Sequence, residues 1–131
     1  KIITDIIKVQ GVNQKRIIID HNTEDSLPIC LKTECFCGLT VYPYSKLNPS
    51  RVSNMVKDFG PDRLIVNSSA DWGVSDPVSL IKVAEYLDKD GHNEKVIKKL
   101  VHDNAMTLYS YSPNWKPQFD LIPVPVSEYQ R

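Results

Sequence analysis

A histidine and an aspartate that follow short apolar runs are the residues of this 131-residue chain best suited to chemistry. His21 comes directly after Ile17-Ile18-Ile19-Asp20, and Asp71 comes shortly after Leu64-Ile65-Val66. Neutral imidazole and carboxylate both bind Zn²⁺ at roughly 2.0–2.2 Å. The carboxylate can also take a proton from a metal-bound water, because the metal lowers the pKa of that water to about 7. The pair therefore suggests metal-activated water, provided that the fold brings both side chains to one edge.

A structural role for both residues is the alternative interpretation. Short polar side chains after a strand often cap a helix or close a turn, and Asp20 and Asn22 suit that role. Asp71-Trp72-Gly73 also fits an ordinary loop. His92 and His102 lie in a turn between helices and on a helix, where we expect them to be structural or to face solvent. The pattern alone leaves both interpretations open.

The three cysteines, Cys30, Cys35 and Cys37, are interpreted as free thiols. Their odd number and the lack of a secretory signal favour a reducing, cytoplasmic setting. Their spacing does not fit a structural zinc knuckle, so small buried thiols are the simpler account. The serine-nucleophile motif G-x-S-x-G, the P-loop and G-x-G-x-x-G do not occur in the sequence.

Alternating helices and strands must position these side chains. Helices are expected over 1–10 and 24–33, from Asn48-Pro49 to Gly60, from Asp76-Pro77 to Gly91, and after Asn93; strands are expected over 16–20, 36–42 and 63–67. Strands separated by helices require crossover connections, hence a parallel sheet and the α/β class. Ligands gather at the carboxyl ends of such strands, and all three strands here end in polar residues.

Burial follows from the same pattern. The β-branched run at 16–20 is of the kind buried on both faces of a parallel sheet. Phe59 and Ile81 are expected on the apolar faces of their helices. Three parallel strands alone leave two open edges and a small core, so we expect the chain to be part of something larger.

Composition excludes some classes of protein. Sixteen Lys and Arg balance sixteen Asp and Glu, so no net positive field points to nucleic acid or anionic membrane. The 41% hydrophobic and 24% charged residues are typical of a globular protein. No apolar run approaches the roughly 20 residues that span a bilayer. We expect one folded region at 1–111 and a proline-rich tail at 112–131.

Four segments together resemble a known family: 17–22, 38–43, 63–73 and 101–109. They are Ile-Ile-Ile-Asp-His-Asn, Gly-Leu-Thr-Val-Tyr-Pro, Arg-Leu-Ile-Val-Asn-Ser-Ser-Ala-Asp-Trp-Gly and Val-His-Asp-Asn-Ala-Met-Thr-Leu-Tyr. Their order and spacing resemble the last three strands and the closing helix of a TatD-like metal-dependent hydrolase. That family belongs to the amidohydrolase superfamily of (β/α)₈ barrels. The resemblance covers about residues 1–110.

The resemblance implies a TIM-type barrel of which this chain is the C-terminal part. It implies that His21 binds a divalent metal, zinc or similar, and that Asp71 binds the metal and accepts the proton of the attacking water. Further residues are expected around the substrate: Tyr42, Tyr44 and Trp72 at the mouth of the pocket, and Asn67 and Ser68 orienting the loop with Asp71. The substrate is expected to be a small-molecule or nucleotide-like ester, amide or phosphodiester.

The chain departs from the family pattern in two respects. Asn67-Ser68-Ser69-Ala70 precedes Asp71 where the family commonly has Glu-Thr-Asp, and Asp76 is the fallback for the aspartate. The opening His-x-His of the family has no counterpart here, and a full barrel has about 250 residues. We therefore expect residues not in this chain to complete the metal site, and this fragment to be inactive alone. The alternatives are a non-catalytic barrel or scaffold protein and a small α/β binding module without a metal site.

Overall fold

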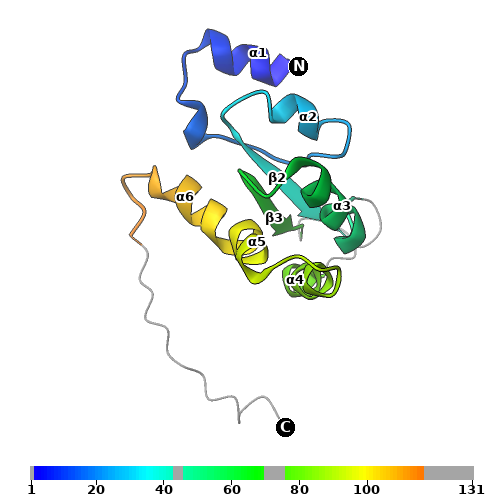
Figure 1. Ribbon diagram of the computed structural model, residues 1–131. Coiled ribbons are helices and arrows are strands. Elements are labelled where there is room, and N and C mark those ends of the chain that lie inside the picture. The colour runs from blue at the N-terminus through cyan, green and yellow to red at the C-terminus, as the bar shows by residue number, and fades with distance from the viewer. Residues whose placement is uncertain (1, 43–45, 70–75, 117–131) are drawn as a thin grey trace.

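The computed structural model of the chain describes residues 2–42, 46–69 and 76–116 (Figure 1). Its helices are α1 (Ile2–Val9), α2 (Leu27–Cys30), α3 (Pro49–Phe59), α4 (Ser79–Lys89), α5 (Glu94–Lys98) and α6 (Asn104–Ser110). A 3₁₀ turn lies at Gln14–Arg16, and a π-helical segment, Lys99–Asp103, joins α5 to α6. The strands are β1 (Ile18–Ile19), β2 (Phe36–Val41) and β3 (Leu64–Ser68).

The three strands form one parallel sheet in the order β1-β2-β3. This confirms the α/β class with a parallel sheet. Thr40 of β2 is paired with Asn67 of β3, so these two side chains lie at the same height near the carboxyl ends of their strands. The interpretation of 16–20 as a strand buried on both faces is wrong. β1 has only two residues and Ile18 is 37% exposed, because within the described residues β1 pairs with β2 alone.

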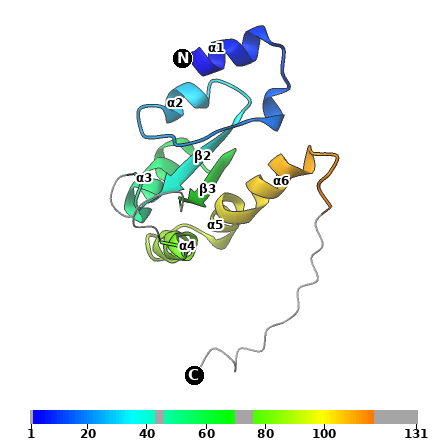
Figure 2. The same ribbon diagram turned by 180° about the vertical axis from the view of Figure 1, so that it is seen from behind.

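Helices cover the two faces of the sheet unequally (Figures 1 and 2). One face packs against α2, α3, α4 and the start of the C-terminal helical segment. That core includes Leu27, Leu39, Val52, Met55, Leu64, Val83, Leu87 and Leu100. The other face has a small cluster of Phe36, Ile65 and Leu108, the last from α6. Each fully buried side chain of this size contributes about 1.5–3 kcal/mol, so the first face holds most of the folding energy.

Two helices begin at the caps that the sequence predicts. Asn48 Oδ1 accepts from the backbone N–H of Arg51 at 3.0 Å, and Asn93 Oδ1 accepts from Val96 at 3.0 Å. Gly60 ends α3 at φ 76°, a conformation that favours glycine.

The prediction that α4 begins at Asp76-Pro77 is wrong. The helix begins at Ser79, because the Asp76 carboxylate closes a turn ahead of it. Asp76 Oδ1 accepts from the N–H of Val78 at 3.1 Å, and its Oδ2 pairs with Lys82 at 2.6 Å.

Some apolar side chains expected in the core are at the surface. Phe59 is 38% exposed and Ile81 is 60% exposed, so their placement on buried faces is wrong. Neither belongs to the buried clusters on the two faces of the sheet. Ile7 is the buried residue of α1, whose other large apolar side chains face solvent. Figure 1 shows α1 beyond α2, on the far side from α4.

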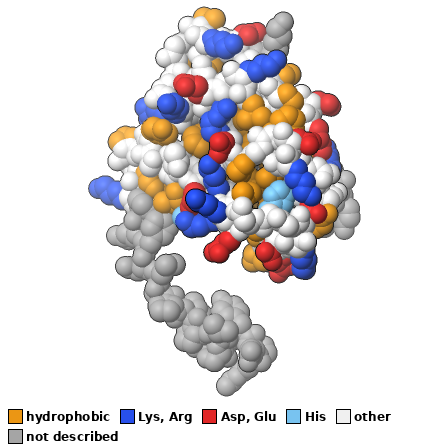
Figure 3. All heavy atoms as spheres, in the orientation of Figure 1, with side chains coloured by type: hydrophobic (Ala, Val, Ile, Leu, Met, Phe, Trp, Pro, Cys, Tyr) orange, Lys and Arg blue, Asp and Glu red, His pale blue; other side chains and the backbone are white. Residues whose placement is uncertain are grey.

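Charges of both signs are mixed over the surface. Figure 3 shows Lys and Arg side chains interspersed with Asp and Glu on the face that it presents. Among residues 2–42, 46–69 and 76–116, no helix combines the length and apolar character needed to cross a bilayer.

Candidate functional site

Side chains from all three strands meet at the carboxyl edge of the sheet. Asp20 directly follows β1, and its Oδ1 accepts from Thr40 Oγ1 of β2 and from Asn67 Nδ2 of β3, each at 3.0 Å. The same oxygen accepts from the backbone N–H of His21 at 2.8 Å. We call Asp20, His21, Thr40 and Asn67 the rim cluster. A single carboxylate oxygen thus ties the ends of three strands together.

Gly38 makes room for this carboxylate. A Cβ at position 38 would overlap Asp20 Oδ1 and would lie 3.1 Å from Asp20 Cα. The Asp20 side chain therefore lies over the bare backbone of β2, from which it reaches Thr40 and Asn67. No side chain larger than glycine fits beneath it without movement.

His21 is held in an unusual backbone conformation beside Asp20. Its φ is 59°, which is uncommon for a residue other than glycine. Such strain concentrates at functional sites, where the surrounding contacts maintain it. The ring is exposed, and its Nδ1 lies 2.8 Å from Thr40 Oγ1 and 3.4 Å from Lys46 Nζ. The imidazole of this exposed residue is thus held at the rim through its Nδ1.

The segment after His21 is anchored by a buried amide. Asn22 Nδ2 donates to the carbonyl oxygens of Ile19, at 2.6 Å, and Gly38, at 3.3 Å. Asn22 is 3% exposed, so these bonds lie in a dry environment and the loss of the amide would be costly. They hold His21 against the end of β2.

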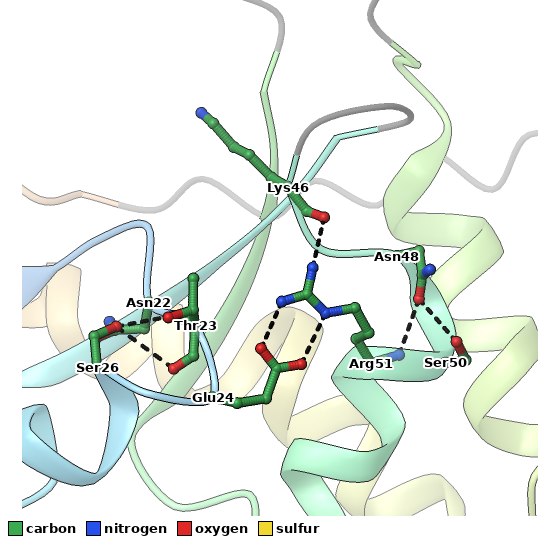
Figure 4. Close-up of polar contacts among 8 residues, drawn as sticks. All are labelled: Asn22, Thr23, Glu24, Ser26, Lys46, Asn48, Ser50 and Arg51. Atoms are coloured by element: carbon green, nitrogen blue, oxygen red, sulfur yellow. Dashed lines mark hydrogen bonds and ion pairs between the residues drawn. The ribbon is translucent and has the colours of Figure 1, made fainter.

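Arg51 of α3 joins the segment after β1, at Glu24, to the segment after β2, at Lys46 (Figure 4). Its guanidinium donates to both carboxylate oxygens of Glu24, at 2.8 and 2.5 Å, and to the carbonyl oxygen of Lys46 at 3.0 Å. A hollow of about 220 Å³ lies between them, lined by His21, Thr40, Lys46 and Arg51 among others. A second hollow of about 210 Å³ also touches His21 and includes Asp20.

The carboxylates of this region are held in the ionised form. Burial by itself would raise the pKa of Asp20, but the hydrogen bonds from Asn67, the His21 N–H and Thr40 outweigh it and lower that pKa below its usual value. The hydrogen bonds from Arg51 lower the pKa of Glu24 to about 2. At neutral pH both groups are hydrogen-bond acceptors only.

A hydroxyl, a carboxylate and an imidazole also meet at a second place, between α3 and the turn after α4. Ser53 Oγ of α3 donates to Asp90 Oδ2 at 2.5 Å and lies 2.8 Å from His92 Nε2. Lys57 Nζ pairs with the same carboxylate oxygen at 2.6 Å. We call these four residues the helix cluster. In a nucleophilic triad the serine gives its proton to histidine, whereas Ser53 gives it to aspartate, so this cluster is a structural clamp.

The predicted site residues fall into two groups. His21 and Asn67 belong to the rim cluster. Tyr42 is 9% exposed, and Lys46 Nζ lies 5.8 Å from the centre of its ring. Ser68 is exposed at the end of β3. Asn67 Nδ2 donates to Asp20 Oδ1. The remaining predicted residues, Asp71, Tyr44 and Trp72, lie outside the described residues.

The sequence does not reveal that Asp20 lies at the centre of the rim cluster, or that Lys46 lies beside the His21 ring. In the sequence Asp20 suits a cap, but in the fold it bonds to residues of two neighbouring strands. The available signal was a carboxylate after one strand opposite a glycine in the next. In the described ranges 2–42, 46–69 and 76–116, no three His, Cys, Asp or Glu side chains lie together as a metal would require.

A hollow larger than the two beside His21 lies at the opposite edge of the sheet. It has a volume of about 400 Å³ and is lined by Lys15, Phe36, Arg63 and Tyr111 among others. The guanidinium of Arg63 donates to the carbonyl oxygens of Leu31, Thr33 and Cys35, at 3.2, 2.6 and 2.7 Å. These bonds of Arg63 hold the loop before β2 in place. Parallel sheets bind ligands at the carboxyl ends of their strands, which is the edge opposite to this hollow.

The three cysteines are free and buried, as the sequence predicts. Cys30 is 2% exposed, and Cys35 and Cys37 are fully buried.

No protein-family model matches the chain, and no curated protein matches it in sequence.

Proposed function

We propose that this chain is the C-terminal part of a TIM-type barrel hydrolase that acts through metal-activated water. One observation carries the proposal: Asp20, His21, Thr40 and Asn67 converge at the carboxyl edge of three parallel strands. Parallel α/β proteins build their reactive sites at that edge, from the ends of several strands.

The donor chemistry of His21 fits one metal ligand. The hydrogen bonds described for its ring involve Nδ1, and the ring is exposed at the rim. A metal-binding histidine is usually oriented by a hydrogen bond at its other nitrogen, and Thr40 supplies such a bond. Asp71 is proposed as the second ligand and as the acceptor of the water proton, with residues outside this chain completing the site. A bound zinc or similar ion would supply water that ionises near neutral pH.

Two features support the barrel. Within the described residues β1 and β3 each pair on one side only, and most large apolar side chains of α1 face solvent. Further strands and helices of the same barrel are proposed to cover them.

The three free thiols support a cytoplasmic location.

The size and charge of the hollow beside His21 bear on the substrate. About 220 Å³ admits a small molecule or one residue of a larger one. Lys46 lines it, which suits a carbonyl or phosphoryl oxygen of an ester, amide or phosphodiester, while the charge of Arg51 beside it is paired with Glu24.

Metal binding and turnover in the complete protein test the proposal. Zinc content is measured after purification without chelators, and hydrolysis is followed with p-nitrophenyl acetate and bis(p-nitrophenyl) phosphate. Asp71→Asn should abolish turnover and leave the circular-dichroism spectrum unchanged, and His21→Ala should lose zinc. His102→Ala, at an exposed histidine on the π-helical segment, is the matched control and should retain both.

Full activity in Asp71→Asn would remove the proposed role of that residue. A complete protein that binds no zinc and hydrolyses neither ester would favour a scaffold or binding function.

A further inference from the structure

The hydrogen bonds of Thr40 determine where the His21 proton lies. A threonine hydroxyl has one proton and two acceptor lone pairs. Thr40 Oγ1 lies 3.0 Å from Asp20 Oδ1 and 2.8 Å from His21 Nδ1. The ionised carboxylate can only accept, so the hydroxyl proton points to Asp20. Thr40 Oγ1 must then accept from His21, which places a proton on Nδ1.

Lys46 opposes this arrangement. Its ammonium has donors only, and Nζ lies 3.4 Å from the same Nδ1. A bond from Lys46 would require an unprotonated Nδ1, which would in turn compete with Asp20 for the hydroxyl proton. The Thr40 contact, at 2.8 Å, is shorter than the Lys46 contact, at 3.4 Å, so it prevails while the hydroxyl is present.

We propose that Asp20, acting through Thr40, is a positioning residue that holds the His21 proton on Nδ1 and leaves Nε2 unprotonated. This inference deepens the proposed function and rests on it in one respect, namely that Nε2 is the nitrogen that binds the metal. Neutral imidazole binds a metal through an unprotonated nitrogen, and the bond at the other nitrogen fixes which one it is.

The surroundings make Asp20 rigid enough for this role. Its Oδ1 accepts three hydrogen bonds, and its side chain lies against the backbone of Gly38. The backbone N–H of His21 donates to the same oxygen at 2.8 Å. Both ends of the Asp20–Thr40–His21 chain are therefore fixed by contacts independent of the ring.

The ring nitrogens of His21 can be observed directly. In ¹⁵N-labelled full chain, two-bond ¹H–¹⁵N spectra at a pH where the ring is neutral separate a protonated from an unprotonated nitrogen. The chain has three histidines, so the signals are few. Wild type should show a protonated Nδ1 at His21. Thr40→Val removes the acceptor, leaves Lys46 as the neighbour of Nδ1, and should move the proton to Nε2.

Conservative and distant variants separate positioning from general damage. Thr40→Ser keeps the hydroxyl and should restore the wild-type pattern. Asp20→Ala frees the hydroxyl proton to point at Nδ1 and should also move the ring proton to Nε2. Thr107→Val, which removes an exposed helix hydroxyl bonded to Asp103, is the matched control and should leave His21 unchanged. An unprotonated Nδ1 in wild type, or an unchanged ring in both Thr40→Val and Asp20→Ala, overturns the inference.

Zinc titration of the complete protein distinguishes this inference from the proposed function. Thr40→Val should weaken zinc binding by about 10–100-fold, and Thr40→Ser should recover it. If the ring proton moves as expected but wild type binds no zinc, the positioning role stands and the metal function fails. If wild type binds zinc and the ring proton does not respond to the variants, the metal function stands and the positioning role fails.

Discussion

The rim cluster and the helix cluster share one arrangement of hydrogen-bonding groups. In each, a hydroxyl lies between a carboxylate and an imidazole, and a lysine is nearby. Ser53 donates to Asp90 and so accepts from His92 Nε2–H, just as Thr40 donates to Asp20 and accepts from His21 Nδ1–H. The two histidines therefore carry their protons on opposite nitrogens.

The clusters differ in what each leaves open. In the helix cluster Nε2 is used against a fully buried serine, and Lys57 neutralises the carboxylate. In the rim cluster Nδ1 is used, and the ring is exposed beside two hollows. Residue type alone therefore does not distinguish the structural clamp from the rim cluster, which we propose to be reactive. The two clusters differ in the ring nitrogen that is bonded and in their place in the fold.

Among substitutions that affect one cluster and not the other, Gly38→Ala is expected to have the largest effect, and it acts on the rim cluster. The added Cβ overlaps Asp20, and because Asp20 Cα is also close, the backbone must move. We expect a loss of about 2–3 kcal/mol in the free energy of unfolding, measured with urea. The His21 nitrogen signals should change while those of His92 do not.

Gly91→Ala is the control for this substitution. Gly91 has φ 88° and nothing within contact of a new Cβ, so its cost of about 1 kcal/mol comes from backbone conformation. A smaller loss for Gly38→Ala than for Gly91→Ala would contradict the close approach of Asp20.

Ser53→Ala should break the helix cluster with little effect on the rim. The hydroxyl is fully buried and joins α3 to the turn after α4, so its removal leaves Asp90 and His92 each without one partner. We expect a loss of about 2 kcal/mol in the free energy of unfolding. Ser110→Ala, at an exposed serine of α6, should cost much less. An equal cost in the two variants would show that the clamp contributes nothing special.

The sequence predicted the parts of this comparison that depend on local signals. Asn48 and Asn93 cap helices because their side chains reach N–H groups three residues ahead. The parallel sheet follows from strands that alternate with helices. These two facts suffice to predict that polar residues of three strands share one edge.

The bonds within each cluster depend on register and packing, which have no local signal. Asp20 reaches Thr40 and Asn67 because Gly38 leaves space, and the pairing of Thr40 with Asn67 sets their common height. Ser53 meets Asp90 through the packing of α3 against the end of α4, 37 positions along the chain. Burial at β1 was predicted wrongly because a β-branched run carries no information about how many neighbours its strand has.

A pH series should show that the ion pair between Glu24 and Arg51, beside the rim cluster, makes a small contribution to the stability of the fold. Arg51 lowers the pKa of Glu24 from 4.5 to about 2, so the ion pair stabilises the fold fully above pH 4.5. That stability is lost as the pH falls toward 2, where the folded protein also takes up the proton. The side chains are 45% and 40% exposed, so the effect is under about 1 kcal/mol. Melting temperatures of wild type and Glu24→Gln should converge on acidification, and a constant gap would contradict the pair.

The smallest effect is expected when the two lysines are exchanged for methionine. Lys57 holds the pKa of Asp90 below its usual range, and the hydrogen bond from Ser53 adds to this. Lys57→Met should raise the pKa of Asp90 in an NMR titration with little change in melting temperature, because Ser53 still holds the carboxylate. Lys46→Met should leave the His21 proton on Nδ1, because Thr40 already decides its place and the lysine only opposes it. A ring proton that moved in Lys46→Met would show that the lysine, and not the hydroxyl, sets the difference between the two histidines.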